Sequence, residues 1–126
     1  MKTILVVDDF SSIQKFLCET LEKKGYKTLG ASDGIEAYKL LSENKVVDLV
    51  LSDYNMPNCT GMELLNKIKA NEKLAHIPVI FLTTETKVEK MQAAKEAGLF
   101  AWIRKPYNAD AFFAQIDNAL AQKQLI

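Results

Sequence analysis

The sequence has little cysteine and histidine and carries no net charge. Its 126 residues include two cysteines and one histidine, and 16 basic side chains balance 16 acidic ones. Cys18 and Cys59 show neither CxxC spacing nor a nearby histidine cluster, so neither a zinc site nor a redox motif is indicated, and we expect two reduced thiols. The balanced charge argues against a general attraction to nucleic acid or to an anionic membrane surface.

Long hydrophobic runs are also missing. The apolar run at 4–7 is too short for a signal peptide, and no stretch approaches the length of a membrane span. We therefore expect a cytoplasmic protein that has neither a membrane nor nucleic acid as a partner. The length suits one domain, by the usual prior of roughly 100–200 residues. We predict a single domain over residues 1–126 that acts as a monomer.

Five short apolar runs are spread along the chain. Most of them are continuous rather than alternating, which is typical of strands that are buried on both faces of a parallel sheet. We predict strands at 3–7, 27–31, 48–52, 78–82 and 99–103.

Capping-box signatures between these strands indicate where helices begin. In such a box, an N-cap residue is followed three positions later by Glu or Gln. Gly25 and Gly98 stand where helices commonly end. The four candidate boxes are Ser11 with Gln14, Asp33 with Glu36, Thr60 with Glu63, and Thr86 with Glu89.

The remaining helical residues complete a regular alternation. Lys87, Lys90 and Lys95 are expected to form a solvated helix face. Strand and helix alternate five times, which predicts an α/β sandwich with right-handed crossovers. A last amphipathic helix, about 109–121, is predicted to turn Phe112, Phe113, Ile116 and Leu120 inward.

Polar side chains follow most of the predicted strands. In open α/β sheets, loops at the carboxyl ends of the strands converge on a ligand site at the switch point of the topology. In the common strand order 2-1-3-4-5, the second strand lies outermost and away from that site. The converging residues are Asp8 and Asp9 after the first strand, Asp53 after the third, Thr83 and Thr84 after the fourth, and Lys105 after the fifth.

Three clustered carboxylates repel one another, so they either hold protons or hold a cation. Mg²⁺ suits such a set, because it prefers oxygen ligands and uses only one or two protein carboxylates together with water and phosphate oxygens. With the metal, Lys105 and Thr83 contacting phosphoryl oxygens, one aspartate could act as a nucleophile and become an aspartyl phosphate. Asp53 is the best candidate, because it stands alone after the central strand.

Four motifs, taken together and in order, resemble the response regulator receiver domain over essentially the whole chain. They are "VVDD", "LVLSDYNMP", "FLTTE" and "IRKP". The resemblance implies a doubly wound (βα)5 flavodoxin-like or CheY-like sandwich, of the stand-alone chemotaxis type. It also implies a cis bond between Lys105 and Pro106. The implied roles are Asp53 as phosphoacceptor, Asp8, Asp9, Asp53 and the backbone carbonyl of Asn55 as Mg²⁺ ligands, Lys105 as phosphate partner, and Thr83 and Trp102 as switch residues.

The same resemblance implies a phosphoryl donor and a target. A sensor histidine kinase or a phosphotransfer protein would supply the phosphoryl group. The phosphorylated domain would then bind a target protein, with the flagellar motor switch as one candidate. The chain would catalyse only its own phosphotransfer and autodephosphorylation, so it would not be an enzyme that turns over a separate substrate.

Other interpretations remain open at this point. Taken singly, Asp8 and Asp9 suit a helix N-terminus, Asp53 suits a turn, and Trp102 suits ordinary packing. Within signalling, the chain could be a phosphorelay intermediate or a regulator of a non-motor target. Outside it, a small aspartyl-phosphate phosphohydrolase or a flavodoxin-like binding module would share the fold. The hydrolase normally has a D-x-D pair, and the binding module a glycine-rich phosphate loop, where this chain has "DDFSS".

Overall fold

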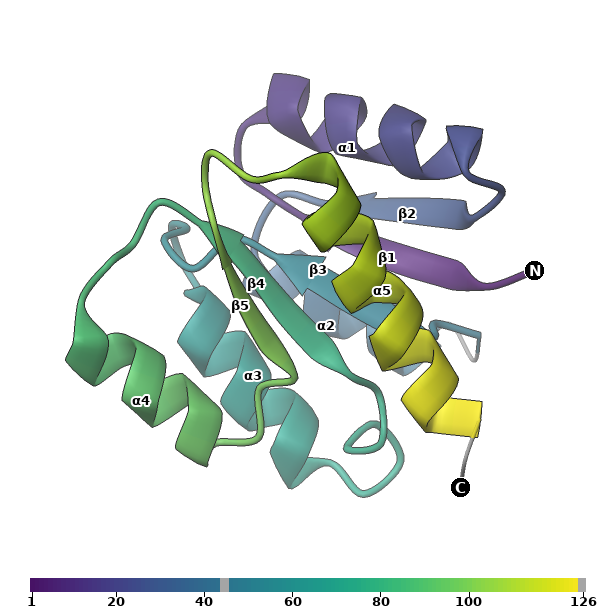
Figure 1. Ribbon diagram of the computed structural model, residues 1–126. Helices are drawn as coiled ribbons and strands as arrows, with labels where there is room; N and C mark the ends of the chain where they lie inside the picture. The colour runs from purple at the N-terminus through teal and green to yellow at the C-terminus, as the bar shows by residue number, and fades with distance from the viewer. Residues whose placement is uncertain (44–45, 125–126) are drawn as a thin grey trace.

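The computed structural model describes residues 1–43 and 46–124, which form a parallel five-stranded sheet between two layers of helices (Figure 1). The strand order is β2-β1-β3-β4-β5, which confirms the predicted fold class. The elements are β1 (Thr3–Val7), α1 (Ser11–Lys23), β2 (Lys27–Ala31), α2 (Gly34–Glu43), β3 (Leu49–Ser52), α3 (Gly61–Ala70), β4 (Val79–Thr83), α4 (Val88–Glu96), β5 (Ala101–Arg104) and α5 (Ala109–Gln124).

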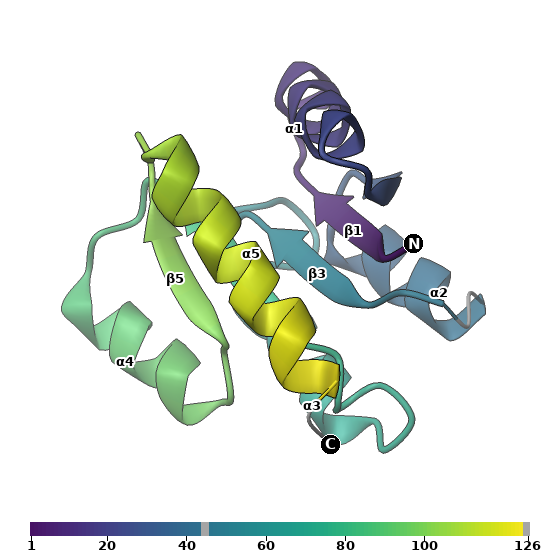
Figure 2. The same cartoon turned by 45° about the vertical axis from the view of Figure 1, so that its right-hand side comes forward.

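The continuous apolar strands are explained by burial on both faces of the sheet. In β1, Leu5 and Val7 belong to the core cluster beneath α2, α3 and α4, whereas Ile4 and Val6 belong to the cluster beneath α1 and α5. Successive side chains of a strand point to opposite faces, so a strand covered on both sides needs apolar residues at every position. Figure 2 shows α5 lying across one face of the sheet, with α2 and α3 behind it.

Three predicted strands start too early. The strands predicted at 48–52, 78–82 and 99–103 are observed at Leu49–Ser52, Val79–Thr83 and Ala101–Arg104. The largest shift has a clear cause at the end of α4. Leu99 donates its backbone N–H to the carbonyl of Ala94, so it closes the helix instead of joining the sheet.

Both glycines predicted to end helices do so in the left-handed region. Gly25 follows α1 with φ 95°, and Gly98 follows α4 with φ 100°. This conformation favours glycine because it has no Cβ. Their position in the sequence was therefore sufficient to locate two helix ends.

The four predicted capping boxes have three different outcomes. Thr60 and Glu63 form the complete reciprocal box at the start of α3. At α2, the Asp33 carboxylate accepts from the backbone of Glu36, but the Glu36 carboxylate accepts from the backbone of Ser32 rather than from that of Asp33.

The other two boxes were predicted wrongly. Helix α1 has Phe10 at its N-cap and α4 has Lys87, and neither cap residue makes a side-chain hydrogen bond to its helix. Before α4, the Glu85 carboxylate accepts from the backbone N–H of Lys87 and of Thr86. In α1, the Gln14 side-chain amide instead donates to the backbone carbonyls of Asp8 and Ala31.

Helix α5 is longer than predicted and packs as expected. Phe112, Ile116 and Leu120 are buried against the sheet, whereas Phe113 is half-buried under the Lys24 ammonium, 4.8 Å from its ring centroid. Within residues 1–43 and 46–124, no helix combines the length and apolar character needed to cross a membrane.

Candidate phosphoryl and metal site

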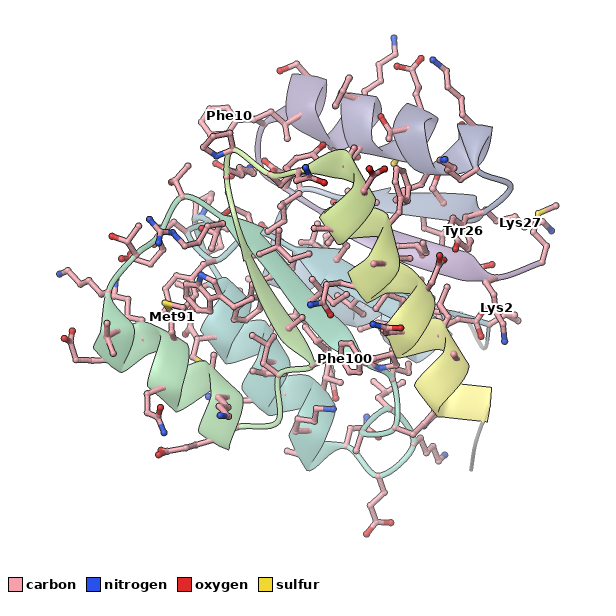
Figure 3. The ribbon with its side chains drawn as sticks, viewed as in Figure 1. Lys2, Phe10, Tyr26, Lys27, Met91 and Phe100 are labelled. Carbon is pink, nitrogen blue, oxygen red and sulfur yellow. The ribbon has the colours of Figure 1, made fainter. Side chains whose placement is uncertain are left out.

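The backbone and side chain of Asp8 are fixed where β1 ends. The side chain is only 2% exposed. The Asp8 backbone N–H donates to the carbonyl of Ala31 at 3.0 Å, and its Oδ1 accepts from the backbone N–H of Phe10 at 2.9 Å. Phe10, labelled in Figure 3, lies where the chain leaves the sheet and enters α1. These bonds hold a buried carboxylate at the carboxyl edge of the sheet.

Asp53 reaches the same edge from β3. Its backbone N–H donates to the carbonyl of Val7 at 3.0 Å, and its Oδ1 accepts from the backbone of Tyr54 at 2.7 Å. Helix α3 returns close to this turn at Gly61, where an added Cβ would lie 2.5 Å from the Asp53 carbonyl oxygen. Glycine is therefore required at position 61 for the chain to pass so near the Asp53 backbone.

The three predicted carboxylates come together. Asp8, Asp9 and Asp53 each offer an oxygen within 4.8 Å of the others. Burial raises the pKa of Asp8 and the neighbouring carboxylates add to this effect, opposed by the Phe10 hydrogen bond and by Lys105. Asp9 Oδ1 is buried and has no hydrogen-bond partner within the described part of the chain. An unpartnered carboxylate oxygen beside two others is a donor set that suits a hard divalent cation such as Mg²⁺.

Thr83 ends β4, and Lys105 directly follows β5. Thr83 is buried at the end of β4, and its backbone carbonyl accepts from the backbone N–H of Lys105 at 2.9 Å. The Lys105 ammonium lies 3.8 Å from Asp8 Oδ2. The Lys105–Pro106 peptide bond is cis, as the family resemblance implied. The Lys105 ammonium thus lies beside the acidic cluster, and Thr83 is joined to Lys105 through the backbone.

Asn55 and Glu85 form the outer rim of the site. Asn55 is exposed, and its side chain is one of the neighbours that lower the pKa of Glu85. Hydrogen bonds from Lys90 and from the backbone of Lys87 lower the pKa of Glu85 to about 2. Lys90 lies 2.9 Å from Glu85 and 5.2 Å from the ring centroid of Tyr54, so it is not part of a merely solvated helix face. This contact could not be predicted from the sequence, because it depends on the direction of the Lys90 side chain in the first turn of α4.

Trp102 does not belong to the acidic cluster, but it packs against Tyr54, the residue that follows Asp53. Its ring packs against Tyr54 at 5.4 Å and against Phe81 at 5.6 Å, between ring centroids. Tyr54 directly follows Asp53, so the aromatic cluster contacts the site through the backbone. Trp102 Nε1 is buried and has no hydrogen-bond partner among the described residues.

A cavity of about 400 Å³ lies between α4 and β5, with Trp102 in its lining. Met91 and Phe100, both labelled in Figure 3, contribute to the same lining. This hollow is lined mostly by apolar residues. A movement of the indole would change its shape.

The family of the chain follows from comparison with known proteins. Residues 4–117 match the response regulator receiver domain. The chain belongs to this family, and its similarity is to the receivers of CheY-like response regulators, in keeping with a two-component system and with chemotaxis.

Individual relatives support this assignment. Chemotaxis protein CheY-3 of Vibrio cholerae is 37% identical over 115 residues, which cover 90% of this chain and 88% of that protein. A receiver domain protein from Clostridium thermocellum superposes with a TM-score of 0.92 at 34% identity, covering 99% of this chain and 98% of that one. The response regulator TrrA of Thermotoga maritima, solved with Mg²⁺ and BeF, has a TM-score of 0.84 at 31% identity, with coverages of 95% and 100%.

Proposed function

We propose that this receiver domain accepts a phosphoryl group on Asp53 from the phosphohistidine of a sensor histidine kinase or a phosphotransfer protein. The observation that carries the proposal is the grouping of three carboxylates within 4.8 Å beside the Lys105 ammonium. Asp8, Asp9 and Asp53, with the backbone carbonyl of Asn55, would hold Mg²⁺. When bound, the ion would neutralise charge on the phosphoryl oxygens. The structure of the related TrrA with Mg²⁺ and BeF supports a metal in this role.

Asp53, Lys105 and Thr83 have different roles in the phosphoryl transfer. A carboxylate oxygen of Asp53 forms the new bond to phosphorus, while the bond between phosphorus and the donor imidazole breaks and its electron pair returns to that nitrogen. Oδ1 of Asp53 already accepts from the Tyr54 backbone at 2.7 Å, which orients the carboxylate and makes Oδ2 the attacking atom. Lys105 approaches the added oxygens as a positive charge, and Thr83 donates its hydroxyl to one of them.

The new dianion then biases the binding face of the domain. Thr83 Oγ1 now accepts from the backbone of Glu85 at 3.2 Å, so its movement toward the phosphoryl group rearranges the turn before α4. Trp102 responds because it packs on Tyr54 beside Asp53. The altered α4 and β5 face binds a target protein, in chemotaxis the flagellar motor switch.

The protein is a regulator whose chemistry is limited to its own phosphotransfer and dephosphorylation. The phosphoryl group would come from ATP through the kinase, either directly or by way of the phosphotransfer protein, so the domain works in the cytoplasm. The acids after β1 and the absence of a D-x-D pair there favour this role over a phosphohydrolase or a flavin-binding module.

Intact-mass measurement after incubation with acetyl phosphate tests the proposal. We expect the wild type to gain one phosphoryl group only when Mg²⁺ is present, and Asp53→Asn to gain none. Asp110→Asn, which changes an exposed carboxylate in the first turn of α5, serves as the matched control and should behave like the wild type. Phosphorylation of Asp53→Asn to the wild-type extent would reject Asp53 as the acceptor.

A further inference from the structure

Gln14 makes a side-chain contact that its position in a helix does not predict. It lies in the first turns of α1, half-buried, and its backbone N–H donates to the carbonyl of Phe10 as part of the helix. Its side-chain amide leaves the helix and reaches the sheet. Nε2 donates to the carbonyl of Asp8 at 3.1 Å and to the carbonyl of Ala31 at 2.9 Å.

These two bonds close a ring of hydrogen bonds that involves the backbone N–H and the backbone carbonyl of Asp8. The Ala31 carbonyl accepts both from Gln14 Nε2 and from the Asp8 backbone N–H at 3.0 Å. The Asp8 carbonyl accepts from the same amide nitrogen. Gln14 therefore cross-links the ends of β1 and β2 at the residue that begins the acidic pair. An amide nitrogen has two hydrogens, and both are used here.

Gly30 provides the space for this amide. A Cβ at position 30 would lie 2.9 Å from Gln14 Cδ and nearer still to Gln14 Oε1. Gly30 has no left-handed φ that would itself require glycine. The absence of a side chain at position 30 is explained by the Gln14 amide that packs over it.

We infer that Gln14 is a positioning residue for the metal site, acting through the backbone of Asp8, with Gly30 making room for it. This inference rests on the proposed Mg²⁺ site. Gln14 does not contact the metal ligands' carboxylates, but it holds the carbonyl that follows one buried ligand and precedes Asp9. Outer partners of metal ligands influence affinity because they restrict the ligand geometry before the ion arrives.

A double-mutant cycle on Mg²⁺ affinity tests the inference. Urea unfolding at several MgCl₂ concentrations gives the free energy of unfolding in EDTA and, from its rise with Mg²⁺, the dissociation constant. We expect Gln14→Ala and Gly30→Ala each to weaken Mg²⁺ binding about tenfold, in the range known for outer-shell partners. Gly30→Ala should have no further effect in the Gln14→Ala background, because the amide that it displaces is already gone.

The control is Gln92→Ala, which removes an exposed amide that donates to Glu96 on the same helix, at 3.1 Å. It should leave the dissociation constant at the wild-type value. A Gln14→Ala protein that loses stability in EDTA but keeps the wild-type dissociation constant would show a purely structural role and overturn the inference. If Gln14→Ala does not fold, a wild-type dissociation constant in Gly30→Ala overturns it equally. If Mg²⁺ does not raise the free energy of unfolding of the wild type, the proposed metal site is rejected. The inference about Gln14 then fails with it, because there is no metal site to position.

Discussion

Removing one carboxylate from the acidic cluster should stabilise the metal-free protein. Folding brings Asp53 within 4.8 Å of both Asp8 and Asp9, from which it is far in the sequence. Each pair at that distance repels by about 0.9 kcal/mol with water-like screening and by about 3.5 kcal/mol at an effective dielectric near 20. Asp53 and Asp9 are half-exposed, and Lys105 offsets part of the repulsion, so the lower figure applies. Asp53→Asn removes two repulsive pairs and should therefore raise the free energy of unfolding by about 2 kcal/mol.

Thermal unfolding followed by circular dichroism in EDTA measures this gain. A domain of this length has an unfolding entropy of about 0.26 kcal/mol per kelvin, so about 2 kcal/mol corresponds to a rise in Tm of about 8 °C. Asparagine retains the oxygen that accepts from the Tyr54 backbone, which keeps the local structure intact. With saturating Mg²⁺ the advantage should shrink or reverse, because the wild type gains metal binding. A Tm for Asp53→Asn equal to or below that of the wild type in EDTA would refute the electrostatic reasoning.

Three further predictions concern the cap, the buried acid and the lysine. Thr60→Ala should lower the free energy of unfolding by about 1 kcal/mol in urea titrations, whereas Thr86→Ala should leave it nearly unchanged, because Thr60 makes a side-chain cap and Thr86 is not the N-cap of α4. In EDTA, lowering the pH from 7 toward 4, close to the ordinary pKa of the carboxyl group, should raise the Tm of the wild type relative to that of Asp8→Asn. The pKa of Asp8 is raised in the folded state above its ordinary value of 3.8, so the folded protein binds the proton at a higher pH than the unfolded chain does. The same dependence of Tm on pH in the wild type and in Asp8→Asn would contradict this. Lys105→Ala should weaken beryllofluoride binding about tenfold or more, by loss of a charge-assisted hydrogen bond of about 1.5–3 kcal/mol, without raising the Mg²⁺ dissociation constant. Equal losses of both affinities would show that Lys105 organises the whole site instead.

The sheet could be predicted from the sequence because burial determines its composition. A run such as Ile4 to Val7 has an apolar residue at every position, and helices cover both faces of the strand. Helix starts were harder, because the capping-box pattern specifies residue types and not which side chain reaches the helix terminus. At α3 the Thr60 pattern and the structure agree. Before α4, the Glu85 carboxylate accepts from the backbone N–H of Thr86, which is the bond that the predicted box would have given to Glu89.

The grouping of the candidate site residues was also predictable, since parallel strands end at one edge. Asp8, Asp9 and Asp53 were expected together for this reason, and in the structure each offers an oxygen within 4.8 Å of the others. Contacts that depend on side-chain direction could not be predicted in this way. Gln14 leaves its helix to reach two carbonyls of the sheet, and Lys90 turns from α4 toward Glu85, neither of which follows from spacing along the chain.

The central claim is that a Mg²⁺-dependent acidic site takes up a phosphoryl group at Asp53 and that Trp102 responds. The single tryptophan of the chain makes one titration sufficient: its fluorescence is followed while Mg²⁺ and then beryllofluoride, a phosphoryl mimic, are added to the wild type and to Asp53→Asn. Trp102 packs on Tyr54, next to the acceptor, so its emission should change on beryllofluoride addition to the wild type only when Mg²⁺ is present, and not in Asp53→Asn. An unchanged emission in the wild type, or an equal change in Asp53→Asn, would contradict the account.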